Sequence, residues 1–181
     1  RAGYLTVEEW RRRSHSFADL AAFDGTSVTL TTADGAERVG VSRITPNFFS
    51  VLGVQPAQGR MFTAQEADAR QHVSLVSHRF WQTHFGGSTR AIGSSIVLDG
   101  LRSEIIGILP ADFELPRLNA EIWEPHTLFP DWDGRRTARG AGGWNVVARL
   151  RPGVSLDQTQ AEMTATAEAL DQEWPANRTQ G

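Results

Sequence analysis

The segment SSIVLDGLRSEIIGIL, residues 94–109, constrains the fold more than any other stretch of this chain. Two apolar, β-branched runs flank Asp99-Gly100, and an Asp-Gly pair between such runs is a strong signal for a two-residue hairpin turn. A second pair of β-branched segments, 26–32 and 37–45, is joined by Ala-Asp-Gly and predicts another hairpin. The chain is therefore expected to contain antiparallel strand pairs.

Helical periodicity occurs near both chain ends. Residues 6–23 predict one amphipathic helix, with Thr6 as its N-cap and Glu9 three residues later in a capping-box pattern. Residues 155–174 predict a second amphipathic helix that begins after Ser155. The other predicted elements are a strand at 72–77 followed by a helix to residue 85, a strand near 121–123 and a strand at 144–150. This mixed order indicates an α+β fold.

The stretch PNFFSVLGVQPAQGRMF, residues 46–62, predicts a one-turn helix that stops at Gly53 and a tight turn around Pro56 and Gly59. We interpret it as a corner between two subdomains and expect Gly53, Pro56 and Gly59 to act as the hinge. A boundary at this corner divides the chain into a layered unit built from both chain ends and an insert, with the bounds 1–59 plus 144–181 and 60–143.

Composition excludes several kinds of chemistry. The chain of 181 residues has no Cys, which excludes disulfides, thiolate nucleophiles and Cys-ligated zinc. All 18 basic residues are Arg, so no lysine can anchor a phosphate loop, a Schiff base or pyridoxal phosphate. The net charge of -3 argues against nucleic acid or an anionic membrane surface as a partner. No apolar run approaches the roughly 20 residues of a membrane-spanning helix.

Histidines and serines give no catalytic pattern. His72, His78 and His84 are six residues apart, and on a strand followed by a helix they are not expected to converge on a metal. Ser77 lies at a strand-to-helix junction, but the G-x-S-x-G pattern of a nucleophile elbow is absent and an N-cap explains the serine.

Two pairs of carboxylates lie close together in the sequence. Glu121 and Glu124 fall in a strand-like segment where alternation separates them, and Asp131 and Asp133 fall in a loop rich in Gly and Arg. A glycosidase-type acid/base couple is therefore a weak interpretation of either pair. No catalytic, cofactor-binding or metal-binding residue is predicted.

Tryptophans leave two other functions open. The chain has six, most of them at positions compatible with packing, and Trp132 in the polar loop 130–143 is the candidate for an exposed partner contact. A carbohydrate-binding domain would use tryptophans and acidic loops to stack and hold sugars. A soluble adaptor would instead bind a protein through loop 130–143.

Five stretches in a fixed order resemble the MacB-like periplasmic core domain of ABC transporter permeases. These stretches are ITPNFFSVLGVQPAQGRMF, VSLVSHRFWQTHFGG, AIGSSIVLDGLRSEIIGILPADF, AEIWEP and VVARLRPGVSLDQTQAEM. None is decisive alone, but together they extend over most of the chain. Loop 130–143 has no counterpart in this pattern.

The resemblance implies a porter-like α/β subdomain from both chain ends, an inserted smaller mixed subdomain and transmembrane helices outside this segment. It implies a location on the periplasmic side of the bacterial inner membrane, without a catalytic role or a cofactor. The expected partners are a second permease copy, a periplasmic adaptor protein and a cytoplasmic ATPase domain or subunit. In that case the domain transmits ATP-driven conformational change to its periplasmic partners during export.

Overall fold

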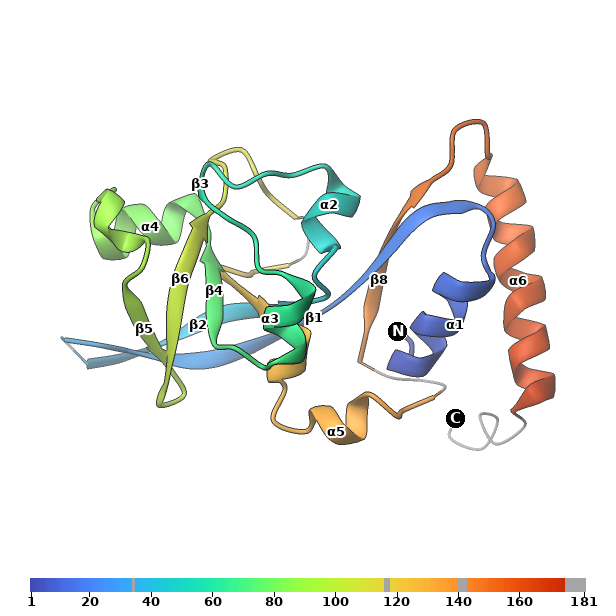
Figure 1. Ribbon diagram of the computed structural model, residues 1–181, viewed down its shortest axis with the longest axis horizontal. Coiled ribbons are helices and arrows are strands. Elements are labelled where there is room, and N and C mark those ends of the chain that lie inside the picture. The colour runs from blue at the N-terminus through green and yellow to red at the C-terminus, as the bar shows by residue number, and fades with distance from the viewer. Residues whose placement is uncertain (34, 116–117, 140–142, 175–181) are drawn as a thin grey trace. The chain divides into compact units, whose positions relative to one another are not determined.

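The computed structural model describes residues 1–33, 35–115, 118–139 and 143–174 (Figure 1). Its mixture of helices and strands confirms the α+β class. None of the helices in these ranges is long and apolar enough to cross a membrane. The elements are α1 (Tyr4–Arg13), β1 (Phe17–Thr32), β2 (Gly35–Ile44), α2 (Phe48–Leu52), β3 (Gln58–Gly59), α3 (Ala64–Asp68), β4 (Val73–Val76), α4 (His78–Phe85), η1 (Thr89–Ala91), β5 (Ser95–Leu98), β6 (Leu101–Ile108), β7 (Ile122–Pro125), η2 (His126–Leu128), α5 (Trp132–Arg135), β8 (Asn145–Leu150) and α6 (Leu156–Glu173).

The chain divides into two compact units. The terminal unit contains Arg1–Ala22 and Asp131–Gly181, and the central unit contains Phe23–Pro130. Strand β1 begins in the terminal unit and continues into the central unit without interruption. The chain therefore passes between the units once within a strand and once after Pro130.

These bounds differ from the division indicated by the sequence. Residues 23–59, which the sequence assigned to the terminal unit, belong to the central unit, and residues 131–139 and 143, which it assigned to the insert, belong to the terminal unit. The physical reason for the first difference is the long pairing of β1 with β2, which holds 23–44 to the central unit. Asp34, residues 140–142 and residues 175–181, which the sequence placed in a hairpin turn, a loop and the terminal unit, lie outside the described residues.

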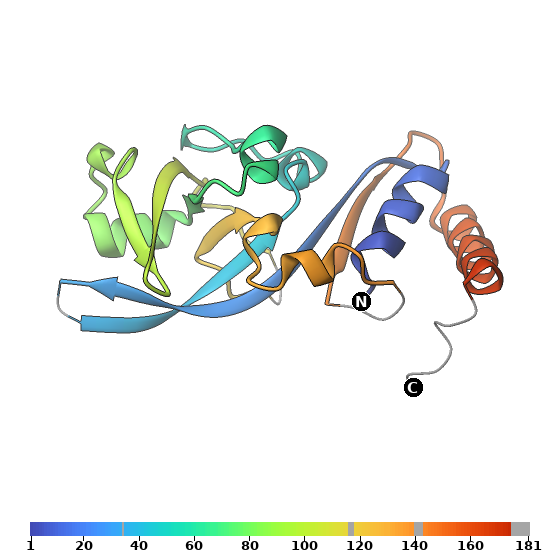
Figure 2. The same ribbon diagram turned by 60° about the horizontal axis from the view of Figure 1, so that its bottom comes forward.

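Within the described part of the central unit, six strands pair in a closed ring. Strand β1 pairs with β2, β2 with β7, β7 with β4, β4 with β6, β6 with β5, and β5 with β1. The β2–β7 and β4–β6 pairs are parallel and the others are antiparallel. Figure 2 shows β2 beside the part of β1 with which it pairs, Phe23–Thr32. The ring closes through Leu30 and Thr31 of β1, which lie opposite Leu98 and Val97 of β5.

The ring encloses the main apolar core. Alternate residues of its strands point inward, as the two-residue period of a strand requires, and Phe80 and Trp81 of α4 join them. The cluster consists of Val28, Leu30, Val39, Val41, Val76, Phe80, Trp81, Ala91, Ile96, Leu98, Ile105, Ile108 and Ile122. Helix α4 thus contributes to the interior of a small closed barrel.

The terminal unit places α1 and α6 with β8 and the first part of β1. Strands β1 and β8 are hydrogen-bonded neighbours, and the Arg151 amide donates to the Ser16 carbonyl at 2.9 Å. Val7 of α1, Leu20 of β1 and Leu170 of α6 are buried. These residues show that each of the three elements contributes to a packed apolar interior.

The predicted helix over 6–23 is wrong beyond Arg13. Residues 17–32 form β1, and the backbone amides of His15 and Ser16 donate to the Glu162 carboxylate instead of to helix carbonyls. The capping assignment is also wrong because Gly3 is the N-cap and Thr6 lies inside α1. Pairing of β1 with β2 and β8 overrides the local helical periodicity.

The predicted turn at Asp99-Gly100, the helix stop at Gly53 and the cap at Ser155 are confirmed. Asp99 and Gly100 have φ values of 47° and 82°, the left-handed conformation that a type I′ hairpin turn needs. Gly53 ends α2 with φ 74°, and Ser155 and Gln158 form a capping box at α6. At these places the local sequence is sufficient to predict the backbone conformation.

Candidate functional site

The three histidines have separate environments, as expected. His72 is exposed at the start of β4, while the His78 ring lies 5.3 Å from Trp81. His84 lies against Phe80, with ring centroids 4.1 Å apart. Within the described ranges, no group of three or more His, Cys, Asp or Glu residues could hold a metal ion.

Ser77 is an N-cap, as the sequence indicates. Its hydroxyl accepts a hydrogen bond from the Phe80 amide at 3.0 Å, at the start of α4. The paired carboxylates of loop 130–143 contact arginines on their own helix: Asp131 lies 2.7 Å from Arg135, and Asp133 lies 3.5 Å from Arg136. These contacts are typical of solvated ion pairs along a helix.

Gly53, Pro56 and Gly59 lie within the central unit and not where the chain passes between units. Gly59 has φ 76°, and a Cβ at this position would lie 2.2 Å from the Ile106 carbonyl oxygen of β6. The glycine therefore allows β3 to approach β6 closely. The hinge role of these three residues stays a prediction.

Trp132 is not the exposed contact that the sequence indicates. Its side chain is 7% exposed and packs edge-on against Tyr4 and Trp144, with ring centroids 4.8 and 6.3 Å away. The segment around Trp132 forms the short helix α5, which turns the ring inward. Trp81, Trp123 and Trp144 are buried as well, so these rings are not presented for stacking on a sugar.

A buried ion pair between Arg43 and Glu124 lies inside the closed ring. The Arg43 Nε and Glu124 Oε2 atoms are 3.6 Å apart, and the side chains are 11% and 4% exposed. On β2 the inward positions continue from Val41 to Arg43, and on β7 from Ile122 to Glu124. Charged groups thus occupy positions that the strand period assigns to the core.

Polar and aromatic neighbours surround this pair. Burial raises the pKa of Glu124, while the nearby Arg43 charge and a hydrogen bond from Ser103 act in the opposite direction. The Ser103 hydroxyl also lies 2.6 Å from that of Ser74, and the Arg43 guanidinium lies 4.7 Å from the centre of the Phe129 ring. The sequence suggested Glu124 only as a neighbour of Glu121 and did not predict this network.

In the terminal unit, Glu162 of α6 holds the corner where α1 ends and β1 begins. One carboxylate oxygen accepts hydrogen bonds from the Ser14 hydroxyl at 3.0 Å and the Ser16 amide at 2.9 Å. The other oxygen accepts one from the His15 amide at 2.5 Å. Arg13 extends this contact through two hydrogen bonds to Glu173, at 2.7 and 2.6 Å. We call these groups the α1–α6 clamp.

Burial alone would raise the pKa of Glu162, but the hydrogen bonds from Ser16, His15 and Ser14 outweigh it and lower the pKa to about 2. Because the folded pKa lies below that of the unfolded chain, this group stabilises the fold above the ordinary Glu range near 4.3. The contribution is lost as the pH falls from about 5 toward 2.

Glu162→Gln is expected to lower the free energy of unfolding at pH 7 by about 1–2 kcal/mol, because the charge-assisted hydrogen bonds weaken while solvent screens part of the effect. The loss should shrink between pH 5 and pH 3. Urea unfolding across this pH range measures it. Glu168→Gln on the exposed side of α6 is the control, and an equal loss in both variants would count against the clamp.

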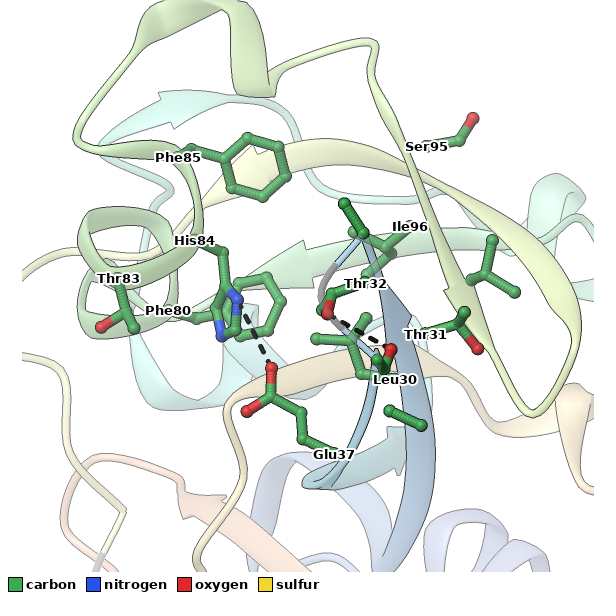
Figure 3. A pocket seen from close by; sticks show the side chains of 14 residues that line it. Leu30, Thr31, Thr32, Glu37, Phe80, Thr83, His84, Phe85, Ser95 and Ile96 are labelled. Atoms are coloured by element: carbon green, nitrogen blue, oxygen red, sulfur yellow. Dashed lines mark hydrogen bonds and ion pairs between the residues drawn. The ribbon is translucent and has the colours of Figure 1, made fainter.

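An open pocket of about 620 Å³ lies at one mouth of the barrel (Figure 3). The hairpin of β1 and β2 forms one wall, α4 another and β5 a third. His84 Nδ1 lies 3.6 Å from Glu37 Oε1 across the pocket, as the dashed line in Figure 3 shows. Thr83 and Ser95 are exposed at the rim, and Figure 3 shows their hydroxyls directed away from the pocket.

This chain is similar in sequence and fold to proteins that are already known. The family model described as the MacB-like periplasmic core domain matches residues 2–166. A macrolide export ATP-binding/permease protein MacB of Burkholderia pseudomallei (strain K96243) is 28% identical over 126 residues, 68% of this chain and 19% of the relative. The MacB protein of Sodalis glossinidius is 25% identical over 107 residues, 57% of this chain and 16% of the relative.

Solved structures share the fold at lower sequence identity. The periplasmic region of MacB from Actinobacillus actinomycetemcomitans has a TM-score of 0.74 and 12% identity, with 100% of this chain and 85% of that chain covered. The extracellular domain of the noncanonic ABC-type transporter YknZ from Gram-positive bacteria has a TM-score of 0.71 and 16% identity, with 94% and 83% covered.

The fold is therefore that of the porter-like extracytoplasmic domains of transporters. The chain belongs to the family of MacB-like periplasmic core domains. It spans less than a fifth of the length of the two curated relatives, at 16% and 19%. The family resemblance stated from the sequence is confirmed. The match to the two longer MacB relatives covers only part of their length.

Proposed function

We propose that this chain is the non-catalytic extracytoplasmic domain of an ABC transporter permease and that it transmits ATP-driven conformational change during export. The observation that supports this most strongly is the family match over residues 2–166, which includes residues of both compact units. The relatives from Burkholderia and Sodalis are described as macrolide export ATP-binding/permease proteins. The cargo of this protein need not be the same.

The connection between elements suggests a path for the motion. The α1–α6 clamp joins α1 to the start of β1, and β1 then continues into the central unit as one strand of 16 residues. A force applied to α1 would reach the barrel through a continuous hydrogen-bonded strand, which is stiffer than a loop. In this proposal a second permease copy, a periplasmic adaptor and a cytoplasmic ATPase domain or subunit are the partners, on the periplasmic side of the inner membrane.

The test uses the full permease that carries this chain, reconstituted with its ATPase. Glu162→Gln together with Arg13→Gln is expected to lower transport several-fold more than ATP hydrolysis, because motion is lost between α1 and β1. Glu168→Gln is the matched control. Transport that stays unchanged in a variant without the clamp would contradict the path, and a full gene without flanking membrane segments would contradict the assignment to a permease.

A further inference from the structure

We propose that the barrel mouth in the central unit is a binding site for a small organic cation, an alkyl- or arylammonium group with a compact apolar body. The inference goes beyond the proposed function, which assigns no ligand to this unit. It rests on the pocket of about 620 Å³ bounded by the β1–β2 hairpin, α4 and β5 (Figure 3). This volume falls in the range of small-molecule sites, and the mouths of β-barrels are a common place for them.

The pairing register of β1 and β2 determines which way the Glu37 side chain points. Glu37 lies opposite Leu30 in the β1–β2 register, and cross-strand partners share a face of the sheet. Leu30 belongs to the buried core, so Glu37 also lies on the inner face of the barrel, at its open end. The Glu37 carboxylate therefore lies next to the inward-pointing apolar side chains of β2, of which Val39 is the nearest along the strand.

The Glu37 carboxylate is also accessible to a cationic ligand. The Glu37 side chain is 49% exposed, and its contact with His84 at 3.6 Å is too long for a hydrogen bond. Neighbouring Arg38 is on the outer face, where its guanidinium donates to the Ser27 carbonyl at 3.1 Å. Among the described residues that line the pocket, Glu37 is the only Asp, Glu or Arg. The mouth thus offers an accessible anionic acceptor without a permanent cation beside it.

The remaining walls suit the apolar part of such a ligand. Phe85 is half-buried beside Phe80, with ring centroids 6.4 Å apart, and Ile96 lines the opposite side. Aromatic faces attract ammonium groups as well as apolar carbon. Glu37 lies at the edge of this apolar wall and supplies the anionic group. Together these groups favour a cation over a neutral or anionic molecule of the same shape.

The experiment is an NMR titration of the 181-residue chain with 3-phenylpropylammonium. Chemical-shift changes are expected at Glu37, His84, Phe85 and Ile96. The neutral isostere 3-phenylpropanol and the anion 3-phenylpropionate should bind at least about tenfold more weakly, because they lack the charge-assisted hydrogen bond to Glu37.

Glu37→Gln should weaken binding of the ammonium probe by about tenfold, whereas Glu104→Gln on the outer side of β6 should leave it unchanged. The proposal is overturned if the ammonium and the alcohol bind equally, if the shifts lie elsewhere, if millimolar probe gives no shift, or if Glu37→Gln binds as the parent does. None of these results depends on transport.

Discussion

Glu124→Ala is expected to lower the free energy of unfolding of the central unit by about 3–5 kcal/mol at neutral pH. The substitution leaves Arg43 charged inside the barrel, where its side chain is 11% exposed and Glu124 is the anion with which it pairs. An unpaired buried charge has lost its hydration without an ionic partner to replace it. Urea unfolding followed by circular dichroism measures the loss from the transition midpoint and slope.

The matched control is an exposed ion pair in the same unit. Arg60 pairs with Glu66 at 2.7 Å, but its side chain is 55% exposed. Arg60→Ala is therefore expected to cost at most about 1 kcal/mol. Similar losses for Glu124→Ala and Arg60→Ala would show that the interior of the ring does not desolvate the Arg43–Glu124 pair.

Replacing both Arg43 and Glu124 measures the net contribution of the ion pair to the free energy of unfolding. The single variant instead measures the cost of leaving one charge buried without its partner. The double variant Arg43→Met with Glu124→Leu should recover most of the stability lost in Glu124→Ala, because no charge remains buried.

The pKa of Glu124 also determines how the stability of the parent protein changes with pH. Burial raises the pKa of Glu124, so the parent protein loses stability, relative to the double variant, as the pH rises above the ordinary Glu range.

Local chemistry explains which elements could be predicted from the sequence. The Asp99-Gly100 turn needs left-handed φ values that Gly and Asp adopt readily, so the hairpin follows from a few residues. The stop at Gly53 and the cap at Ser155 are equally local. Each of these features depends on backbone conformation within one turn, which the neighbouring residues largely determine.

Long-range pairing explains the main errors. Residues 14–23 carry a helical apolar pattern, yet β1 is stabilised by neighbours far away in the sequence, β2 and β8. The interval from Arg11 to Ser16 without an apolar residue was the available signal for a helix end. Closure of the ring, where Leu30 meets Leu98, has no local signature. For the same reason the compact units could not be bounded correctly from the sequence.

Among the residues of the candidate sites, some could be predicted from the local sequence and others could not. Arg43 continues the alternation of Val39 and Val41, and this was a readable sign that a charge points into the core. Glu162 gave no such sign, because its role depends on the amides of His15 and Ser16. Trp132 lies in a polar stretch, and its burial depends on Tyr4 and Trp144 at distant places in the sequence.

Trp144→Ala is expected to lower the free energy of unfolding of the terminal unit by about 3–5 kcal/mol. The side chain is 1% exposed and packs edge-on against Tyr4, with ring centroids 5.6 Å apart, and against Trp132. Its removal leaves a cavity between two aromatic rings and also eliminates their edge-to-face contacts. Far-UV circular dichroism in urea is the suitable readout, since the substitution changes the tryptophan fluorescence.

Trp174→Ala provides a matched control for the loss of a tryptophan in the same unit. The Trp174 ring is only partly buried, and the guanidinium groups of Arg13 and Arg139 lie 5.8 and 3.9 Å from its centre. Partly exposed cation–π contacts contribute about 0.5–1 kcal/mol each, so a loss near 1–2 kcal/mol is expected. If Trp144→Ala costs no more than Trp174→Ala, the aromatic cluster of Tyr4, Trp132 and Trp144 is not the packing centre of the terminal unit. A larger loss for Trp144→Ala would instead place the principal stability of this unit in that cluster, because both variants remove the same side chain and differ in how deeply it is buried.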